Sequence, residues 1–146
     1  MAKPLSENRR ARFDYEIIDR LEAGIELLGS ETKSARSGRM GLSGSYAVIR
    51  DGQLWLLNAQ VPPYQQNNTP ENYEPARTRR LLLRKSEISR LSGILEQKGT
   101  VLVALKAYTK RNRIKIELGV GRSRKTHDKR ELLKKKADIR EMRKAR

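Results

Sequence analysis

Apolar and polar residues alternate in several short stretches of this chain, which is the period of a β-strand with one buried face. Residues 45–50 and 53–58 are two runs rich in strand-forming residues. They flank Asp51-Gly52, the dipeptide that a type I′ hairpin turn prefers. Residues 101–108 and 114–118 form a second pair around a short turn, and the latter stretch alternates cleanly. The pattern therefore predicts two antiparallel hairpins.

The stretch 14–28 is compatible with two structures. Its residues Ile17, Leu21 and Ile25 recur at helical intervals. Gly24 weakens the helix and is compatible with a bent strand or a bulge. The spacing of apolar residues leaves both structures open.

Two other segments carry helix boundary signals. Ser30 caps a helix over residues 30–37, which Gly38 stops. Ser86 caps a second helix that ends at Gly99. The second helix has an apolar face made of Ile88, Leu91, Ile94 and Leu95.

Residues 61–75 contain four prolines and three asparagines, a composition typical of a long loop with a functional role. The following residues, 76–85, are rich in arginine. As a short helix this segment presents Arg77, Arg80 and Arg84 on one side, and the simplest interpretation is a solvated cationic face. Its position beside the loop instead favours a phosphate-binding surface whose asparagines reach bases or ribose 2′-hydroxyls.

Strand pairs mixed with helices, without a regular β-α-β order, predict an α+β domain over residues 1–120. We expect an antiparallel sheet or small barrel, compatible with the OB group, with two or three appended helices. Residues 121–146 form a separate basic C-terminal tail.

The composition narrows the function classes. A formal net charge of +16 favours a polyanionic partner, and the scarcity of apolar residues in the tail favours nucleic acid over a membrane surface. The chain has no cysteine and one histidine, so we expect no metal site, no cofactor and no enzymatic activity. No segment has the length and apolarity of a membrane span or signal peptide, which predicts a cytoplasmic protein. The few aromatic residues favour a folded RNA, recognised by shape and backbone.

The tail holds half of the net charge, with twelve cations and four anions over residues 121–146. Asp128 and Glu131 have the spacing of a capping box, which predicts a helix beginning immediately after His127. The run Lys134-Lys135-Lys136 favours disorder in isolation. We therefore expect a tail that is disordered when free and helical when RNA neutralises it.

Taken together, these motifs resemble the small protein B family, bacterial proteins that bind transfer-messenger RNA (tmRNA, also called SsrA RNA) in trans-translation. The resemblance covers nearly the whole chain. It is carried by residues 8–12, 15–17, 22–27, 29–36, 45–46, 72–75, 77–83, 114–119 and 127–131.

The resemblance implies an OB-like β-barrel that holds the tRNA-like domain of tmRNA. It also implies ribosome rescue, in which the tail enters the decoding centre and the mRNA channel of the small subunit, against 16S rRNA. Elongation factor Tu is a further candidate partner in delivery. The RNA-binding residues expected from the matching motifs and the basic stretch are Asn8, Glu22, Lys33, Asn68, Asn72, Arg77, Arg79, Arg80, Leu82 and Arg84. The tail residues expected in the decoding centre are Arg124, Lys125, His127, Asp128, Lys129 and Arg130, with His127 matching a stacking position.

The chain departs from the family pattern at five positions, two of which lie in the tail. They are Asn67, Tyr73, Arg84, Ser123 and Asp138. Two other functions remain open from the residues alone. A ribosomal or ribosome-assembly protein also uses a basic tail that threads into rRNA. A hydrolase of RNA or peptidyl-tRNA is disfavoured, because no paired carboxylates or metal cluster accompany His127.

Overall fold

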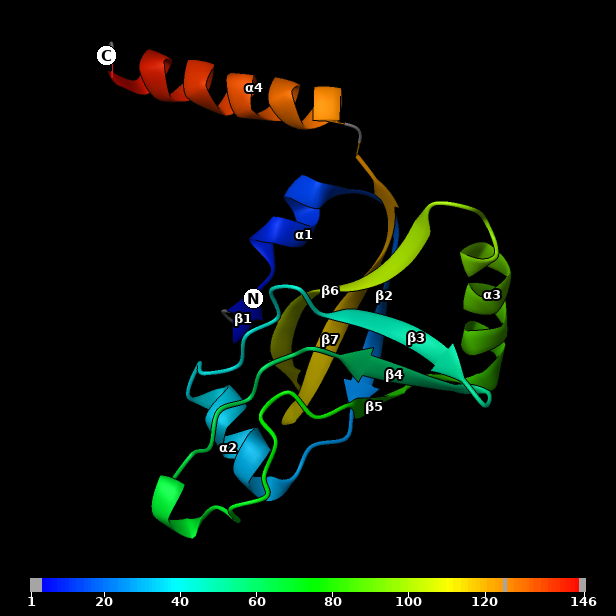
Figure 1. Ribbon diagram of the computed structural model, residues 1–146, viewed down its shortest axis with the longest axis vertical. Coiled ribbons are helices and arrows are strands. Elements are labelled where there is room, and N and C mark those ends of the chain that lie inside the picture. The colour runs from blue at the N-terminus through cyan, green and yellow to red at the C-terminus, as the bar shows by residue number, and fades with distance from the viewer. Residues whose placement is uncertain (1–3, 125, 145–146) are drawn as a thin grey trace.

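The computed structural model describes residues 4–124 and 126–144, and over these ranges it contains seven strands, four α-helices and one short 3₁₀ helix (Figure 1). The strands are β1 (Ser6–Glu7), β2 (Tyr15–Ile25), β3 (Tyr46–Arg50), β4 (Gln53–Leu57), β5 (Arg79–Leu82), β6 (Thr100–Lys110) and β7 (Arg113–Ser123). The helices are α1 (Arg9–Asp14), α2 (Gly29–Arg36), η1 (Gln66–Asn68), α3 (Lys85–Leu95) and α4 (Thr126–Lys144).

The sheet is antiparallel throughout and returns on itself. Its strand order is β1-β6-β3-β4-β5-β2-β7, and β7 also pairs with β6, so six strands form a ring with β1 attached outside β6. The inner face is apolar because alternate residues of the long strands point inward. In β7 these are Ile114, Ile116, Leu118 and Val120, all buried. The expected α+β class with an antiparallel sheet is confirmed.

Both predicted hairpins are present. Asp51 and Gly52 have φ angles of 53° and 71°, the left-handed conformation that a type I′ turn requires between β3 and β4. Arg111 and Asn112 have φ angles of 52° and 62° at the tip of the β6–β7 hairpin. The strands of this second hairpin are longer than the alternating stretches, with 11 residues each.

The stretch 14–28 forms a strand, not a helix. Most of it pairs with β7 as β2, and the register shifts between Ile17 and Asp19. The sequence is compatible with a bulge at Gly24. In the structure Gly24 lies in regular register opposite Leu82 of β5. Pairing with two neighbouring strands therefore outweighs the helical spacing.

Several expected element boundaries are wrong. Residues 76–84 form no helix, because β5 pairs with β4 and β2 and gains the hydrogen bonds of the ring. Helix α2 begins at Gly29, one residue early, because the Glu31 carboxylate accepts the Leu28 N–H at 2.8 Å. Helix α3 begins at Lys85, with Arg84 in the cap position whose N–H Glu87 accepts, and it ends at Leu95, four residues before Gly99.

Two further differences lie near the ends of the chain. Helix α1 was not expected, and Asn8 caps it by accepting the Ala11 N–H at 3.1 Å. Helix α4 begins at Thr126, so Asp128 lies inside the helix and does not cap it.

Helices α1 and α4 lie toward one end of the molecule, and α2 and the loop containing η1 lie at the other (Figure 1). Lys129 of α4 pairs with Asp14 at 3.1 Å and lies over the Phe13 ring, with its Nζ 5.8 Å from the ring centroid. Leu133 and Ile139 of α4 are about half exposed. None of the described helices combines the length and the apolarity that crossing a membrane requires.

Candidate nucleic-acid interface

The tip of the β6–β7 hairpin and the neighbouring parts of β2 and β5 form a charged surface around one exposed leucine. Gly24 lies opposite both Leu82 and Lys115 in the strand registers. A Cβ added to Gly24 would lie 3.3 Å from the Leu82 Cβ and 3.7 Å from the Lys115 Nζ. The glycine therefore lets these two side chains approach each other across β2. We call the whole group the hairpin-end surface: Glu22, Leu82, Lys110, Arg111, Arg113 and Lys115.

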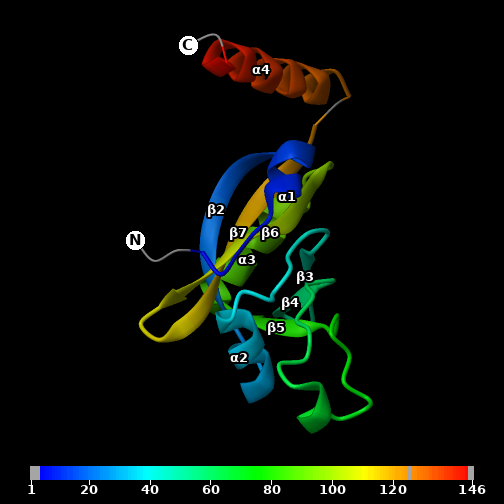
Figure 2. The ribbon, with the colours of Figure 1, turned by 90° about the vertical axis from the view of Figure 1, so that its left-hand side faces the viewer.

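The cations of this surface are concentrated at the turn. Figure 2 shows the β6–β7 hairpin extending past the rest of the sheet. Lys110, Arg111 and Arg113 are exposed there, and Lys115 lies half-buried behind them. The Arg36 guanidinium of α2 donates to the Asn112 carbonyl at 2.7 Å and thereby ties the turn to the body. This arrangement presents four positive side chains on a supported turn, as a phosphate backbone requires.

Glu22 is the one carboxylate of the hairpin-end surface. The Tyr108 hydroxyl donates to its Oε2, and the Lys110 Nζ lies 3.3 Å from its Oε1. The hydrogen bond from Tyr108 lowers the pKa of Glu22, burial opposes this shift, and Lys110 adds to it. Burial and the same hydrogen bond raise the pKa of Tyr108. At neutral pH Glu22 is therefore ionised and acts as a hydrogen-bond acceptor among cations.

The substitution Tyr108→Phe removes the hydroxyl that holds Glu22. We expect the pKa of Glu22 to rise toward its ordinary value, because its strongest stabilising contact is lost. Stability should fall by no more than about 1 kcal/mol, since the bond is exposed to solvent. Titration of the Glu22 carboxyl carbon by NMR measures the pKa. Tyr64→Phe serves as the matched control, and an unchanged Glu22 pKa in Tyr108→Phe would contradict the assignment.

Glu31 anchors the arginine-rich stretch from inside the protein. Its side chain is fully buried, and its Oε1 lies 2.5 Å from the Arg77 guanidinium. Its Oε2 lies 2.6 Å from an Arg79 guanidinium nitrogen and accepts the Tyr73 hydroxyl at 3.1 Å. Burial raises the pKa of Glu31, but hydrogen bonds from Arg77, the Leu28 N–H and Arg79 lower it overall to about 2. This network ties α2, the 61–78 loop and β5 together.

Arg79 is expected from sequence to bind RNA, and the structure corrects this expectation. Its side chain is 0% exposed. Besides Glu31, its guanidinium donates to the Ala59 carbonyl at 3.0 Å and the Pro75 carbonyl at 2.9 Å. No donor is left pointing outward, so Arg79 holds the loop and does not contact a ligand directly. Arg77 keeps 32% exposure and can still face solvent.

Asn8 is also expected from the sequence to bind RNA, but its side chain is buried. It is 3% exposed, and its amide nitrogen donates to the Leu42 carbonyl at 3.0 Å and the Ala104 carbonyl at 2.8 Å. Its amide oxygen caps α1. Both polar atoms of its side chain are therefore used in holding α1 against the body of the protein.

The other expected RNA-binding residues reach the surface or lie outside the description. Lys33, Asn72 and Arg84 are exposed. Arg80 is half-buried, and its guanidinium lies 3.1 Å from Gln53 Oε1 and 3.5 Å from Glu26 Oε1. Asn68 belongs to η1, and its side chain lies outside the described residues.

The tail residues come together only in part. The Arg124 N–H donates to the Asp14 carbonyl at 3.0 Å, and Lys129 pairs with the Asp14 carboxylate. Arg130 is exposed. His127 and Asp128 lie in α4, but their side chains are outside the description, as is the whole of Lys125.

The hairpin cations Lys110, Arg111, Arg113 and Lys115 were not among the expected site residues. A signal for them is present, because three of the four residues in the predicted turn are basic. Only the ring topology shows that this turn lies beside Glu22 and Leu82, which are distant in sequence.

This chain is similar to known proteins in both sequence and fold. The sequence profile described as "SmpB protein" matches residues 5–146. A protein named "SsrA-binding protein" from Chlorobaculum tepidum is 57% identical over 128 residues, which are 87% of this chain and 81% of the relative. Another of that name from Thermosynechococcus vestitus is 50% identical over 143 residues, 98% of this chain and 94% of the relative.

A solved structure shares the fold as well. A chain from a structure described as "tmRNA-SmpB: a journey to the center of the bacterial ribosome" has 48% identity and a TM-score of 0.68. The match covers 82% of this chain and 84% of that one. Since both the profile and these relatives span most of the sequence, the chain belongs to the SmpB family.

Proposed function

We propose that this chain binds the tRNA-like domain of tmRNA through the hairpin-end surface and supports trans-translation as a cytoplasmic RNA-binding protein, not as an enzyme. Its relatives at 48% to 57% identity are named for SsrA binding. The structural observation that carries the proposal is the placement of Glu22 and Leu82 among four hairpin cations. Each component of this surface suits a different part of an RNA strand.

The chemistry of binding follows from the three types of side chain. Lys110, Arg111 and Arg113 neutralise phosphates and release counterions. The ionised Glu22 accepts hydrogen bonds from a ribose 2′-hydroxyl or a base amino group. Leu82, 42% exposed, packs against the apolar face of a sugar or base. A groove lined only by cations would bind any polyanion, so Glu22 and Leu82 supply the selectivity.

The six-stranded ring supports a barrel of the OB type as the platform for this surface. In this arrangement the hairpin-end surface lies at the edge of the barrel. The Glu31 network then fixes the loop beside it, so that Arg77 and Asn72 are presented from a stable base.

The tail completes the proposal. We infer that Arg124 to Arg130 enter the decoding centre of a stalled ribosome against 16S rRNA, where His127 stacks and the remaining tail follows the empty mRNA channel. Elongation factor Tu is the proposed partner during delivery. The +8 charge of residues 121–146 supports this role, since rRNA is a polyanion that cations bind with release of counterions.

The proposal is tested by recovering the protein from cell lysate and sequencing the RNA bound to it. We expect one structured RNA ending in CCA to dominate, and we expect protein association with stalled ribosomes rather than vacant ones. If ribosomal RNA dominates and the protein stays on ribosomes through a high-salt wash, the chain is a structural ribosomal protein instead.

The tail should be disordered in the free protein and helical when bound. The apolar side chains Leu133 and Ile139 of α4 are about half exposed, and the run from Lys134 to Lys136 repels itself without a polyanion. Backbone chemical shifts of the free protein should therefore be close to random-coil values over residues 128–144 and become helical on the ribosome or on RNA. The shifts of α3 provide the internal control. A fully helical free tail would contradict this expectation.

A further inference from the structure

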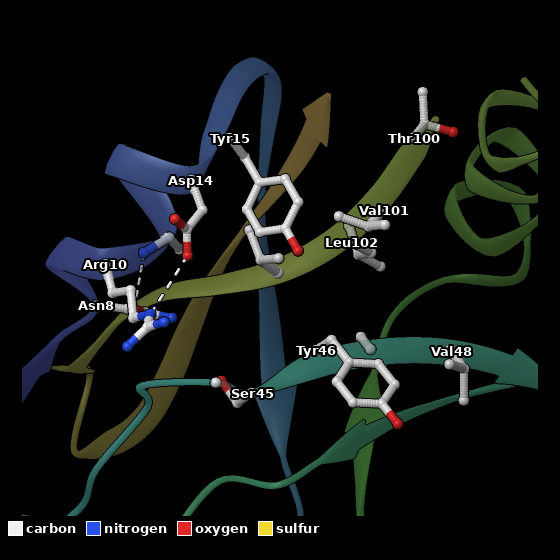
Figure 3. Close-up of a pocket in the computed structure, with 14 residues that line it drawn as sticks. Asn8, Arg10, Asp14, Tyr15, Ser45, Tyr46, Val48, Thr100, Val101 and Leu102 are labelled. Atoms are coloured by element: carbon white, nitrogen blue, oxygen red, sulfur yellow. Dashed lines mark hydrogen bonds and ion pairs between the residues drawn. The ribbon is translucent and has the colours of Figure 1, made fainter. Parts of the chain in front are cut away.

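A groove at the opposite end of β6 carries two aromatic rings that the hairpin-end surface does not use. It lies between α1, β2, β3 and the start of β6, and its volume is about 320 Å³ (Figure 3). Sites for small organic groups begin at about 300 Å³. Tyr15 and Tyr46 border the groove, and its lining includes the apolar side chains of Val48, Val101 and Val103.

The tyrosines of this groove differ from the other three. The Tyr73 and Tyr108 hydroxyls are bonded to Glu31 and Glu22. The Tyr64 ring is covered by the Arg39 guanidinium, 5.8 Å from its centroid. Among the described residues, neither Tyr15 nor Tyr46 has a hydroxyl partner or a cation over its ring. Both hydroxyls and the exposed Tyr46 ring are therefore available to a ligand, whereas the half-buried Tyr15 ring also packs against Gly121 and against Val103 and Leu105.

The charge around the groove favours a phosphate-bearing ligand. Asp14 is the only carboxylate among the described lining residues, and it is held by Arg10 at 3.4 Å and by Lys129 at 3.1 Å. Arg9 and Arg12 of α1 are exposed beside the groove. A slot with an apolar lining, an exposed tyrosine ring and cations at its rim matches a nucleobase attached to its backbone.

We propose that the groove between Tyr15 and Tyr46 receives an unpaired nucleobase as a second RNA contact. This inference rests on the proposed RNA-binding function but concerns a different surface. Thr100 of β6 lines the groove, whereas Lys110 at the other end of β6 belongs to the hairpin-end surface. The two contacts are therefore made with separate parts of the RNA, or with two RNAs.

The test uses the full chain with labelled tyrosine rings, titrated with adenosine 5′-monophosphate and, separately, with ribose 5-phosphate. We expect upfield ring shifts at Tyr15 and Tyr46 with the nucleotide only, and no shift at Tyr64. Tyr46→Ala should weaken nucleotide binding by at least about fivefold, whereas Tyr46→Phe keeps it. The matched control is Tyr64→Ala, because Tyr64 is 38% exposed and Tyr46 is 39% exposed.

Equal shifts with ribose 5-phosphate would overturn the inference, as would no shift at all. Shifts caused by a peptide of residues 126–146 but not by the nucleotide would assign the groove to a protein segment instead. The affinity of Tyr46→Ala for the tRNA-like domain is measured in parallel. If the wild-type chain fails to bind that RNA, the proposed function fails; if it binds and the groove does not respond to the nucleotide, only this inference fails.

A photoreactive phenylalanine analogue at position 46 identifies the source of the base. In the complex with tmRNA and a stalled ribosome, a crosslink to a tmRNA base or to an rRNA base supports the inference and distinguishes the two sources. A crosslink confined to protein overturns it.

Discussion

Replacing the three exposed cations of the hairpin turn, Lys110→Gln, Arg111→Gln and Arg113→Gln together, is expected to weaken binding of the tRNA-like domain by roughly 100-fold at physiological salt. Each cation neutralises about one phosphate, so the slope of log affinity against log salt should become shallower by about 2 to 3. The fold should be unaffected, because these side chains are exposed.

The measurement is a series of binding curves between low and high salt for the wild type and the triple variant. A matched control replaces three exposed cations in and beside α3, namely Lys85, Arg90 and Lys98. This control removes the same net charge from another surface. If both variants lose affinity equally and with the same change in slope, then the attraction is a property of the net charge and the hairpin has no special role.

The second large effect concerns stability. Glu31→Gln leaves the guanidinium of Arg79 buried without its counterion, and we expect the free energy of unfolding to fall by about 3 to 5 kcal/mol. Chemical denaturation followed by circular dichroism measures this loss. Glu26→Gln is the control, since Glu26 pairs with Arg80 on the surface and its loss should cost less than about 1 kcal/mol. A change of similar size in both variants would contradict the role of Glu31.

The same carboxylate makes stability depend on acidity. In the folded chain the pKa of Glu31 is about 2, below its ordinary value of 4.5. The unfolded chain therefore binds a proton first as pH falls, and the stabilisation is fully present above about pH 4.5. It is lost as pH falls from there toward about 2. Unfolding curves in this window should show a steeper loss for the wild type than for Glu31→Gln.

Local sequence patterns predict the hairpins well, because their turn residues and their alternation are both short-range signals. The Asp51-Gly52 turn and the alternation of residues 114–118 each determine a structure without help from the rest of the chain. The stretch 14–28 is different, since its helical spacing is overruled by two neighbouring strands that only the closed ring supplies. Boundaries shift for a similar reason, as when the distant arginine partners of Glu31 hold the start of α2.

The candidate site also combines features that short-range signals predict with features that depend on the tertiary structure. The amino-acid sequence shows that the segment around Arg77 is basic. It does not show which of its side chains point into the protein and which point into solvent. Arg77 and Arg79 both pair with Glu31, but Arg79 at the start of β5 is fully buried, whereas Arg77, just before the strand, keeps 32% exposure. Asn8 likewise matches a family motif but is used to join α1 to the sheet. Only the strand register shows that the hairpin cations lie beside Glu22 and Leu82.

The length of β6 has a mechanical consequence. Its 11 residues span about 35 Å, and pairing with β7 along most of that length makes the two strands a stiff unit. The hairpin tip and the attachment of the tail lie at opposite ends of this unit, since β7 runs from Arg113 to Ser123. The protein thus fixes the distance between the proposed RNA-binding tip and the start of the tail. Lengthening both strands by two residues would preserve each end yet misplace one relative to the other by about 7 Å.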